Sequence, residues 1–409
     1  MPAMARLCNG AWRTGSSVCY PPNAGTHMRM CGHTHRVAKA ACISLLLFSG
    51  SIATSSIAQS GRETARSVSP LRQDVLAQVA AKYKIPGIAV AVLEHGHLRD
   101  VNVFGVRDGK SNAPVSERTV FEAGPLGETL YAYAVLRLAA EGRFNIEAPL
   151  TTYLPLPYVR FLDPISVSES TEPLYDPAFN QITARRVMNH TSGMPDWSRN
   201  QHLRLQSAPG QKWSYSSEGY VYLQHVVEHV TGETFNEFVA RSILRPARMA
   251  RSSFVWRDDY ATEIASGWDR SGALVEIHRY ARPAAAATFY TTIRDYAQFV
   301  TLILASAPAQ RAHESVVSLL LNPSVTVDSA AQFSWGLGVG LEKSSDDLFF
   351  FHREVGPGFQ CFVIASRKTG NGVVIFTNSG NGLDAFSEIL ATTIGGNHPI
   401  LKSTFLRVQ

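Results

Sequence analysis

Glu128, Tyr215 and His352 are side chains of this sequence that could together perform proton-transfer chemistry. A carboxylate, a phenol and an imidazole can act as general bases and acids when their surroundings move their pKa values toward neutrality. Each residue also has a structural interpretation. Glu128 falls in the first turn of an expected helix, where the helix dipole stabilises a negative charge by about 0.3–1 kcal/mol. Tyr215 and His352 could pack on a helix and a strand with their polar atoms satisfied.

Other nucleophiles and metal ligands are sparse. Ser192 lies in a turn, where serines commonly bond the local backbone, and His190 in the same turn is interpreted as structural. Cys361 lies in a strand-like run and is interpreted as a small buried hydrophobe. His225 and His229 are four residues apart but lack the glutamate of a His-Glu-x-x-His zinc helix. We therefore expect no metal site and no cofactor.

The helix that carries Glu128 is strongly patterned. Apolar residues recur along it at three- and four-residue steps: Leu126, Leu130, Tyr133, Ala134 and Leu138. This spacing predicts a helix with one buried stripe. Pro125 suits its first turn, because a proline there loses no hydrogen bond. Gly142 is the expected C-cap.

The remaining pattern predicts an α/β (α+β) fold. Helices are expected at 70–83, from 182, and at 215–230, 233–244, 293–305 and 383–392, and strands at 88–106 (a hairpin), 335–341, 348–351, 359–365 and 372–377. Prolines between 144 and 180 indicate an irregular covering segment. Strands near both ends of the chain, with a mostly helical middle, predict one antiparallel β-sheet flanked by helices. The sheet part comprises about 70–120 and 284–395, and the inserted helical subdomain about 121–283.

The charge of the chain is concentrated at its start. The 409 residues are 45% hydrophobic and 17% charged, with a net charge of +5. Residues 1–58 contain no Asp or Glu and supply the whole excess through Arg6, Arg13, Arg29, Arg36 and Lys39. The rest is formally neutral, so we expect no nucleic-acid partner. Its length and apolar content predict one large domain or two intimately packed lobes.

Residues 1–58 have the pattern of an export signal. Basic residues precede the apolar run 41–48, and small residues follow at 56–58. We expect a signal peptide at about Met28–Ala58, preceded by a misannotated leader, and a periplasmic or secreted protein. The alternative is an uncleaved anchor, although the run is shorter than the roughly 20 residues of a membrane span. The expected order is then a flexible lead-in at 59–69, a domain at 70–395 and a C-terminal tail at 396–409.

Three segments resemble one known family. Residues 181–195 are similar to its Thr-x-x-x-Leu-Leu-x-His-Thr-Ser-Gly-Leu-Pro stretch, 209–217 to Pro-Gly-x-x-Phe-x-Tyr-Ser-Asn, and 243–249 to Leu-x-Pro-Leu-Gly-Met. On these motifs the chain resembles the serine β-lactamase and penicillin-binding-protein family, especially its class C and esterase branch. The resemblance covers roughly residues 70–395 and implies a β-lactamase/transpeptidase-like fold.

The resemblance also implies three catalytic blocks, and all three are altered. The family places Ser-x-x-Lys at the start of the central helix, where this chain has Pro125 and Glu128. No lysine elsewhere has a serine three residues before it. Ser217 stands where the family has asparagine, and His352, Arg353 and Glu354 stand where it has Lys-Thr-Gly or His-x-Gly. The expected cleft is lined by the motif positions, both altered and retained: Pro125, Glu128, Tyr215, Ser217, His352, Arg353 and Glu354.

Two functions follow from this comparison. The first is a pseudoenzyme, an exported serine hydrolase-like protein whose cleft binds a small-molecule, peptide or peptidoglycan-like ligand. The alternative is a hydrolase or other acid/base enzyme that uses Glu128, Tyr215 and His352 on an ester, lactone, β-lactam or peptide. The sequence assigns no catalytic residue under the first reading, and the oligomeric state stays open.

Overall fold

The computed structural model describes residues 71–154, 158–161, 169–172, 176–198, 202–305, 310–344 and 347–406. The expected signal peptide and lead-in lie outside the described residues. Within the described ranges no helix is both long and apolar enough to cross a membrane.

The described chain contains the following elements. The helices are α1 Gln73–Tyr83, α2 Leu126–Ala140, α3 Ala184–Met188, α4 Ser217–Thr231, α5 Phe235–Val239, α6 Ile293–Leu304, α7 Arg311–Leu320 and α8 Gly382–Thr392. The strands are β1 Gly87–Glu94, β2 His97–Gly105, β3 Val120–Glu122, β4 Tyr158–Phe161, β5 Glu169–Glu172, β6 Gly267–Trp268, β7 Leu274–Val275, β8 Tyr290–Thr292, β9 Val325–Asp328, β10 Phe333–Trp335, β11 Gly340–Ser344, β12 Asp347–Val355, β13 Gln360–Ser366 and β14 Gly372–Thr377. Short 3-10 or π turns are η1 Leu150–Thr152, η2 Pro177–Gln181, η3 Ala240–Leu244, η4 Asp258–Tyr260, η5 Pro399–Lys402 and η6 Thr404–Leu406.

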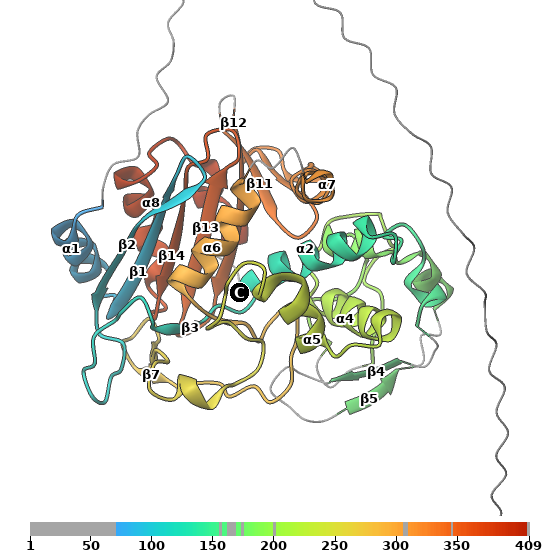
Figure 1. Cartoon of the computed structure of the whole chain (residues 1–409), viewed down its shortest axis with the longest axis horizontal. Coiled ribbons are helices and arrows are strands. Elements are labelled where there is room, and N and C mark those ends of the chain that lie inside the picture. Colours follow the sequence, from blue (N-terminus) through green and yellow to red (C-terminus); the bar gives the residue numbers. More distant parts are fainter. Residues whose placement is uncertain are drawn as a thin grey trace, which may run out of the picture. The chain divides into compact units, whose positions relative to one another are not determined.

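An eight-stranded antiparallel sheet organises the domain, in the order β2-β1-β14-β13-β12-β11-β10-β9 (Figure 1). Strand β1 lies between β2 and β14, with Ile88 opposite Thr377 and Ala91 opposite Val374. The sheet therefore joins the beginning and the end of the domain, as the sequence predicted.

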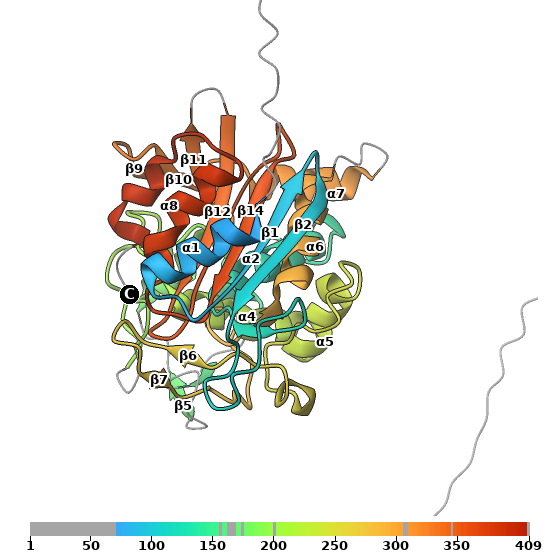
Figure 2. The same cartoon turned by 90° about the vertical axis from the view of Figure 1, so that its left-hand side faces the viewer.

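Both faces of the sheet are covered. Alternate residues of β1 enter two different cores: Ile88, Val90 and Val92 on one face, and Ala89, Ala91 and Leu93 on the other. Helices α1 and α8 cover the first face (Figure 2), and α6 packs against the second. Because both faces are buried, β1 is a continuous apolar run instead of an alternating one.

Helix α2 connects the sheet to the helical part. It follows Pro125, and Gly142 just beyond its end has the left-handed φ of +71° that glycine favours. The expectation of one buried stripe was wrong, because every residue from Leu126 to Leu136 is buried. A helix that is buried on all sides lies inside the core, with other elements packed around it. Here Gly338 approaches Ala132 from the sheet side so closely that a Cβ at Gly338 would overlap it.

Two other boundaries differ from the sequence prediction. Ser216 caps α4 by accepting a hydrogen bond from the backbone N–H of Gly219, so Tyr215 precedes the helix instead of lying on it. The expected strand 335–341 is divided between β10 and β11, with a turn at Gly336–Val339. Helix α7 and the strands β3 to β9 were not predicted. Of these, β4 and β5 pair within the segment 144–180, which was expected to be irregular.

Candidate functional site

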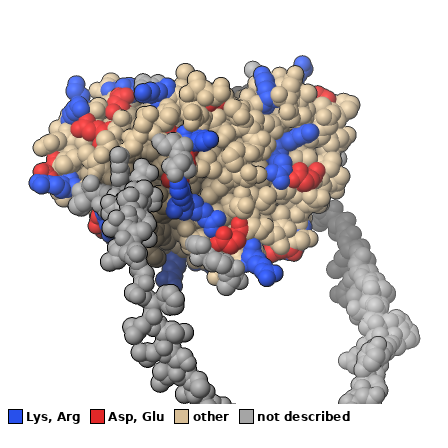
Figure 3. Space-filling model, turned by 90° about the horizontal axis from the view of Figure 1, so that it is seen from above, with Lys and Arg blue, Asp and Glu red and all other residues tan. Residues whose placement is uncertain are grey.

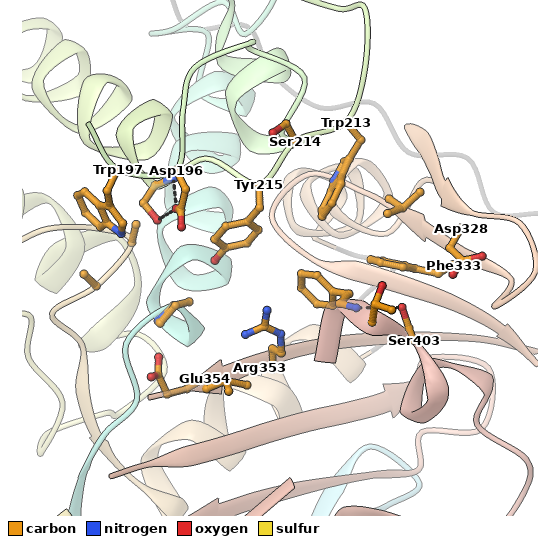
Figure 4. A pocket seen from close by; sticks show the side chains of 18 of the residues that line it. Asp196, Trp197, Trp213, Ser214, Tyr215, Asp328, Phe333, Arg353, Glu354 and Ser403 are labelled. Carbon is orange, nitrogen blue, oxygen red and sulfur yellow. Dashed lines mark hydrogen bonds between the residues drawn. The ribbon is translucent and has the colours of Figure 1, made fainter. Parts of the chain in front are cut away.

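A cavity of about 1170 Å³ lies at the N-terminal end of α2, where the helical part meets the sheet (Figure 4). Segments that are far apart in the sequence supply its lining. They include Pro125 before α2, the loops around Asp196–Trp197 and Trp213–Ser217, the end of β12 with Arg353 and Glu354, and the C-terminal residues Ser403–Phe405. Six of its lining residues are aromatic: Trp197, Trp213, Tyr215, Tyr280, Phe333 and Phe405.

Tyr215 and Arg353 face each other across this cavity (Figure 4). Burial raises the pKa of Tyr215 well above its usual value, and the nearby Glu128 adds to that shift. The neutral phenol of Tyr215, which can donate a hydrogen bond, is therefore favoured over the phenolate. Burial also lowers the pKa of Arg353, but a guanidinium stays charged under ordinary conditions.

Glu354 enters the cavity beside Arg353. Burial raises the pKa of its carboxyl group to about 8, so that the protonated form dominates at pH 7. Gly124 makes room for this side chain, because a Cβ at Gly124 would overlap Oε2 of Glu354. The backbone of Gly124 also has a φ of +40°, so the position just before Pro125 is suited to glycine on both counts.

Ser217 is held by Asp196 at the cavity wall. Its Oγ donates to Oδ1 of Asp196 at 2.6 Å, and its backbone N–H donates to the same oxygen at 3.1 Å. The pair is drawn with dashed lines in Figure 4. Asp196 thus fixes the first residue of α4 and leaves Tyr215 aimed into the cavity.

A second group of residues, the buried cluster of Glu128, His190 and His352, lies next to the cavity without lining it. Oε2 of Glu128 is 3.5 Å from Nε2 of His190 and 3.5 Å from Nε2 of His352. All three side chains are inaccessible or nearly so. The ring of Tyr215 packs on His190 at a centroid distance of 4.3 Å, so Tyr215 contacts both the cavity and the cluster.

Both imidazoles have backbone partners at Nδ1. Nδ1 of His190 accepts a hydrogen bond from the backbone N–H of Ser216 at 3.2 Å, so the neutral His190 ring carries its proton on Nε2, on the side of Glu128. Nδ1 of His352 lies 2.9 Å from the backbone nitrogen of Arg353 and 3.2 Å from the carbonyl oxygen of the same residue. Among the described residues, no group of three or more His, Cys, Asp or Glu side chains is arranged to hold a metal ion.

Burial favours the uncharged forms of all three residues of the cluster. Burial raises the pKa of Glu128 well above its usual value, against the opposing effects of the Tyr215 hydroxyl and the Arg353 charge. Burial lowers the pKa of His352 to about 3 and that of His190 well below its usual value. A protonated carboxyl group thus lies between two neutral imidazoles, which avoids the cost of an unpaired buried charge.

The structure brings together most of the residues singled out in the sequence. Pro125, Tyr215, Ser217, Arg353 and Glu354 line the cavity. Glu128 and His352, which were expected at the cleft, lie beneath its surface instead. They are sealed because α2 is buried on all sides and because His352 points into the protein from β12.

Three residues were missed or given a different role. His190 was interpreted as structural and lies against Glu128. Asp196 and Phe405 line the cavity, but no sequence motif marks either of them. The motif at 181–195 drew attention to His190, but no local sequence pattern indicated that it contacts Glu128 on a distant helix.

Ser192 and Cys361 have the local roles expected of them. Oγ of Ser192 accepts from the backbone N–H of Met194 at 3.3 Å. Cys361 is buried in β13, where burial raises its thiol pKa well above the usual value. Neither residue lines the cavity.

Charged side chains on the outer surface are mixed. On the face shown in Figure 3, Lys and Arg are interspersed with Asp and Glu among uncharged residues. The absence of a nucleic-acid partner stays a prediction from the neutral charge of the domain.

The fold and the site together define a member of the β-lactamase family: the family model named Beta-lactamase matches residues 72–392, so the chain belongs to this family. Among similar proteins, Protein flp of Staphylococcus aureus (strain MRSA252) is 21% identical over 325 residues, covering 73% of this chain and 60% of flp. The chain thus spans less than two thirds of that relative. A β-lactamase of Pseudomonas fluorescens is 23% identical over 260 residues, covering 62% of this chain and 69% of that protein.

Solved structures show the same fold. A class C β-lactamase superposes with a TM-score of 0.65 at 17% identity, covering 81% of this chain and 94% of that one. The D-alanine carboxypeptidase AmpC from Burkholderia cenocepacia gives a TM-score of 0.65 at 17% identity, with 78% and 97% covered. These similarities establish the α/β fold with its large antiparallel sheet and flanking helices.

Proposed function

We propose that this protein is a β-lactamase-family pseudoenzyme, which binds a ligand in the retained cavity and does not form the family's acyl-enzyme. The observation that carries the proposal is the position of Pro125. It lines the cavity at the start of α2, where the resemblance places the nucleophilic serine. Proline offers neither a hydroxyl group nor a backbone N–H at this point.

The partners of a nucleophile are altered as well. A serine of this type needs a nearby base, and removing either member of such a unit usually costs orders of magnitude in rate. The first turn of α2 carries Glu128 in place of the family's lysine. Its side chain is sealed from solvent, and burial raises its pKa well above the usual value. Burial raises the pKa of Tyr215, which disfavours the phenolate form that would take the proton instead.

The alternative acid/base enzyme is disfavoured by the same geometry. Glu128 and His352 have 0% and 1% of their surface exposed and do not line the cavity. A general acid or base must come within hydrogen-bond reach of its substrate, directly or through one water. Of the three residues in that hypothesis, Tyr215 alone faces the cavity.

The lining of the cavity indicates what kind of ligand it takes. Membership of the family implies a small molecule or a peptide. Arg353 is the single Lys or Arg among the lining residues of this cavity, and aromatic rings make up much of the remaining wall. Guanidinium groups bind carboxylates in two-point hydrogen bonds, and aromatic walls bury apolar groups. We propose a ligand with a carboxylate and an apolar or aromatic body, such as a peptidoglycan-like peptide.

Two measurements test this proposal together. Intact mass spectrometry after incubation with a fluorophosphonate and with benzylpenicillin should show the unmodified mass. Calorimetry with N-benzoyl-D-alanine should show binding that Arg353→Gln weakens at least about tenfold, as expected for a charge-assisted contact of about 1.5–3 kcal/mol. An adduct on the wild-type protein would refute the pseudoenzyme, and equal binding by Arg353→Gln would refute the ligand class.

Export is a separate proposal. It is supported by the basic and apolar pattern of residues 28–58. Amino-terminal sequencing of the protein recovered from fractionated cells should find a start close to residue 59 outside the cytoplasm. Recovery of the uncleaved chain from the cytoplasm would contradict it.

A further inference from the structure

A second, smaller pocket of about 140 Å³ adjoins the main cavity. The two spaces share four lining residues: Tyr280, Ala287, Glu354 and Pro357. The small pocket extends beyond them to Glu122 and His278, which do not line the main cavity. None of its described lining residues is a Lys or Arg. It therefore gathers groups that exchange protons, and the proposed function gives no role to Glu122 or His278.

His278 is held in this pocket by Glu122 at the end of β3. The backbone N–H of His278 donates to Oε1 of Glu122 at 2.9 Å, and its ring Nδ1 lies 2.9 Å from Oε2 of the same carboxyl group. An ionised carboxyl group has no proton to give, so it accepts the Nδ1–H, and a neutral ring then has its lone pair on Nε2. No described residue bonds Nε2, and 31% of the side chain is exposed. His278 thus has the arrangement of a general base, with one nitrogen oriented and the other open.

The loop that carries His278 is fixed on its other side by Tyr290 in β8. The Tyr290 hydroxyl donates to the carbonyl oxygen of His278 at 2.5 Å and accepts from the backbone N–H of Tyr280 at 3.2 Å. The rings of His278 and Tyr280 are stacked, with 5.4 Å between their centroids and 17° between their planes. The imidazole is therefore held in one place before any ligand arrives, which acid/base catalysis requires.

Glu354 lies between the main cavity, where Figure 4 shows it, and the small pocket. Its carboxyl oxygens lie over two glycines, because a Cβ at Gly124 would overlap Oε2 and one at Gly356 would come within 2.7 Å of Oε1. Burial raises the pKa of Glu354 to about 8, against the opposing charge of Arg353. At pH 7 the carboxyl group thus keeps a proton that it can donate.

We propose that His278 and Glu354 form a second, acid/base site that hydrolyses a small ester without a covalent intermediate. Nε2 of His278 takes a proton from a water molecule while the water oxygen bonds to the ester carbonyl carbon. The C–O bond to the alcohol then breaks as Glu354 donates its proton to the leaving oxygen. Transfer of a proton from the imidazolium ion to the Glu354 carboxylate, through solvent, restores both groups. Ester and water have then become acid and alcohol.

The two spaces suggest how such an ester is divided between them. The small pocket, at about 140 Å³, has room for a water molecule and a short acyl chain. The main cavity, at about 1170 Å³ and with aromatic residues in its lining, suits a larger apolar alcohol. This route makes no bond to the protein, so the second site goes beyond the proposed function and does not depend on it.

The charges that face the pair set its pH dependence. The carboxyl groups of Glu122, Glu276 and Glu354 surround His278, and the hydrogen bond to Glu122 is the main reason why its pKa is raised above 6.5. Glu354 is faced by Arg353, Glu122 and His278. His278 is a base above its raised pKa, and Glu354 is an acid below about pH 8. The hydrolysis should therefore have a bell-shaped pH profile.

The test uses two esters that share an acyl group and differ in the leaving alcohol. Phenyl acetate releases a phenolate that needs a proton, whereas 4-nitrophenyl acetate releases an anion that is stable without one. His278→Gln should lower kcat/KM about 100-fold for both esters, as expected for loss of a general base. Glu354→Gln keeps the size of the side chain but not its acidic proton. It should slow phenyl acetate about 100-fold and hardly change 4-nitrophenyl acetate.

Two further variants separate this site from unspecific reaction with surface imidazoles. His229→Gln removes an exposed histidine of α4 and should leave both rates unchanged. Glu122 is a positioning residue, and Glu122→Gln should move the acidic limb of the pH profile to lower pH, because the ring loses the carboxylate that raises its pKa. Equal rates for the wild type and a folded His278→Gln protein would overturn the proposal.

A second readout does not depend on turnover. Diethyl pyrocarbonate modifies neutral imidazoles, and peptide mass spectrometry should show that the modification of His278 rises with pH, at a lower pH in Glu122→Gln than in the wild type. A His278 that is not modified would overturn the open base. Normal modification without any hydrolysis that depends on His278 would refute the catalytic role. A fluorophosphonate adduct on the wild type would instead refute the pseudoenzyme proposal alone.

Discussion

Oε2 of Glu128 lies 3.5 Å from Nε2 of His352, and both side chains are sealed from solvent. Burial disfavours the charged form of both groups, because it raises the pKa of the acid and lowers that of the base to about 3. The contact is therefore not an ion pair. Its two members make the stability of the protein depend on pH in opposite directions, which allows each to be tested separately.

Glu128→Gln should become more stable relative to the wild type as the pH rises. The folded pKa of Glu128 is raised above its value of 4.5 in an unfolded chain, so its contribution to stability is complete below pH 4.5 and is lost as the pH rises through the folded pKa. Glutamine does not titrate. In urea unfolding from pH 5 to 8, the difference in unfolding free energy between Glu128→Gln and the wild type should change by up to about 1.4 kcal/mol per pH unit. Glu276→Gln, at an exposed position, is the control, and parallel profiles for the two variants would contradict the expectation.

His352→Asn should have the opposite signature. The pKa of His352 falls from 6.5 to about 3 on folding, so its contribution is complete above pH 6.5 and is lost as the pH falls toward 3. The wild type should lose stability relative to the variant over this range, again by up to about 1.4 kcal/mol per pH unit. His229→Asn, on the exposed side of α4, should show no such trend.

Pro125→Ser alone should not restore a reactive serine. The new hydroxyl group would face the cavity, but the residue one turn further along α2 would still be a buried glutamate whose raised pKa favours the protonated form. Fluorophosphonate labelling, followed by mass spectrometry, should be at background for this variant and above background for Pro125→Ser with Glu128→Lys. The double variant should lose roughly 3–5 kcal/mol of unfolding free energy, because the new ammonium group would be a buried charge without a paired opposite charge. Equal labelling of both variants would show that Glu128 is not what prevents the chemistry.

Gly124→Ala should destabilise the protein through Glu354. The added Cβ would overlap Oε2 of Glu354, and the residue would keep a φ of +40°. We expect a loss of about 2–4 kcal/mol in the free energy of unfolding. Adding Glu354→Ala to Gly124→Ala should recover the part of this lost stability that comes from the overlap. Gly142→Ala is the control, because its φ is +71° and nothing lies within 4 Å of the added atom, so it should cost only about 1–2 kcal/mol. Equal losses at the two glycines would argue against the close packing of Glu354.

The elements that the sequence predicted well are those with local signals. Strand β14 was expected at 372–377 and occupies these residues, and α2 begins after the proline that favours a first turn. Tyr215 was expected on a helix, but it lies just before α4. The apolar pattern of residues 215–230 continues across Ser216, although Ser216 is the N-cap at which the helix begins. A cap depends on one hydrogen bond, which periodicity does not reveal.

The site was only partly predictable for a related reason. Motif positions identified five residues that line the cavity, because motifs record residue types at fixed spacing. Whether a side chain is accessible from the cavity depends on segments that are distant in the sequence. The burial of Glu128 depends on what surrounds α2, and Phe405, which lines the cavity, belongs to a segment that was expected to be a tail.

The pairing of β1 with β14 has a consequence for how the chain folds. Residues 88–93 pair with residues 372–377, so a strand made early in synthesis receives its second neighbour only when most of the polypeptide exists. Contacts between residues so far apart in the sequence slow folding, because the entropy cost of closing the intervening loop must be overcome before the strands can pair. Until then, the apolar edge of β1 is open to pairing with other chains. Production of this protein should therefore be limited by aggregation of incomplete chains, and slower synthesis at low temperature should raise the soluble yield.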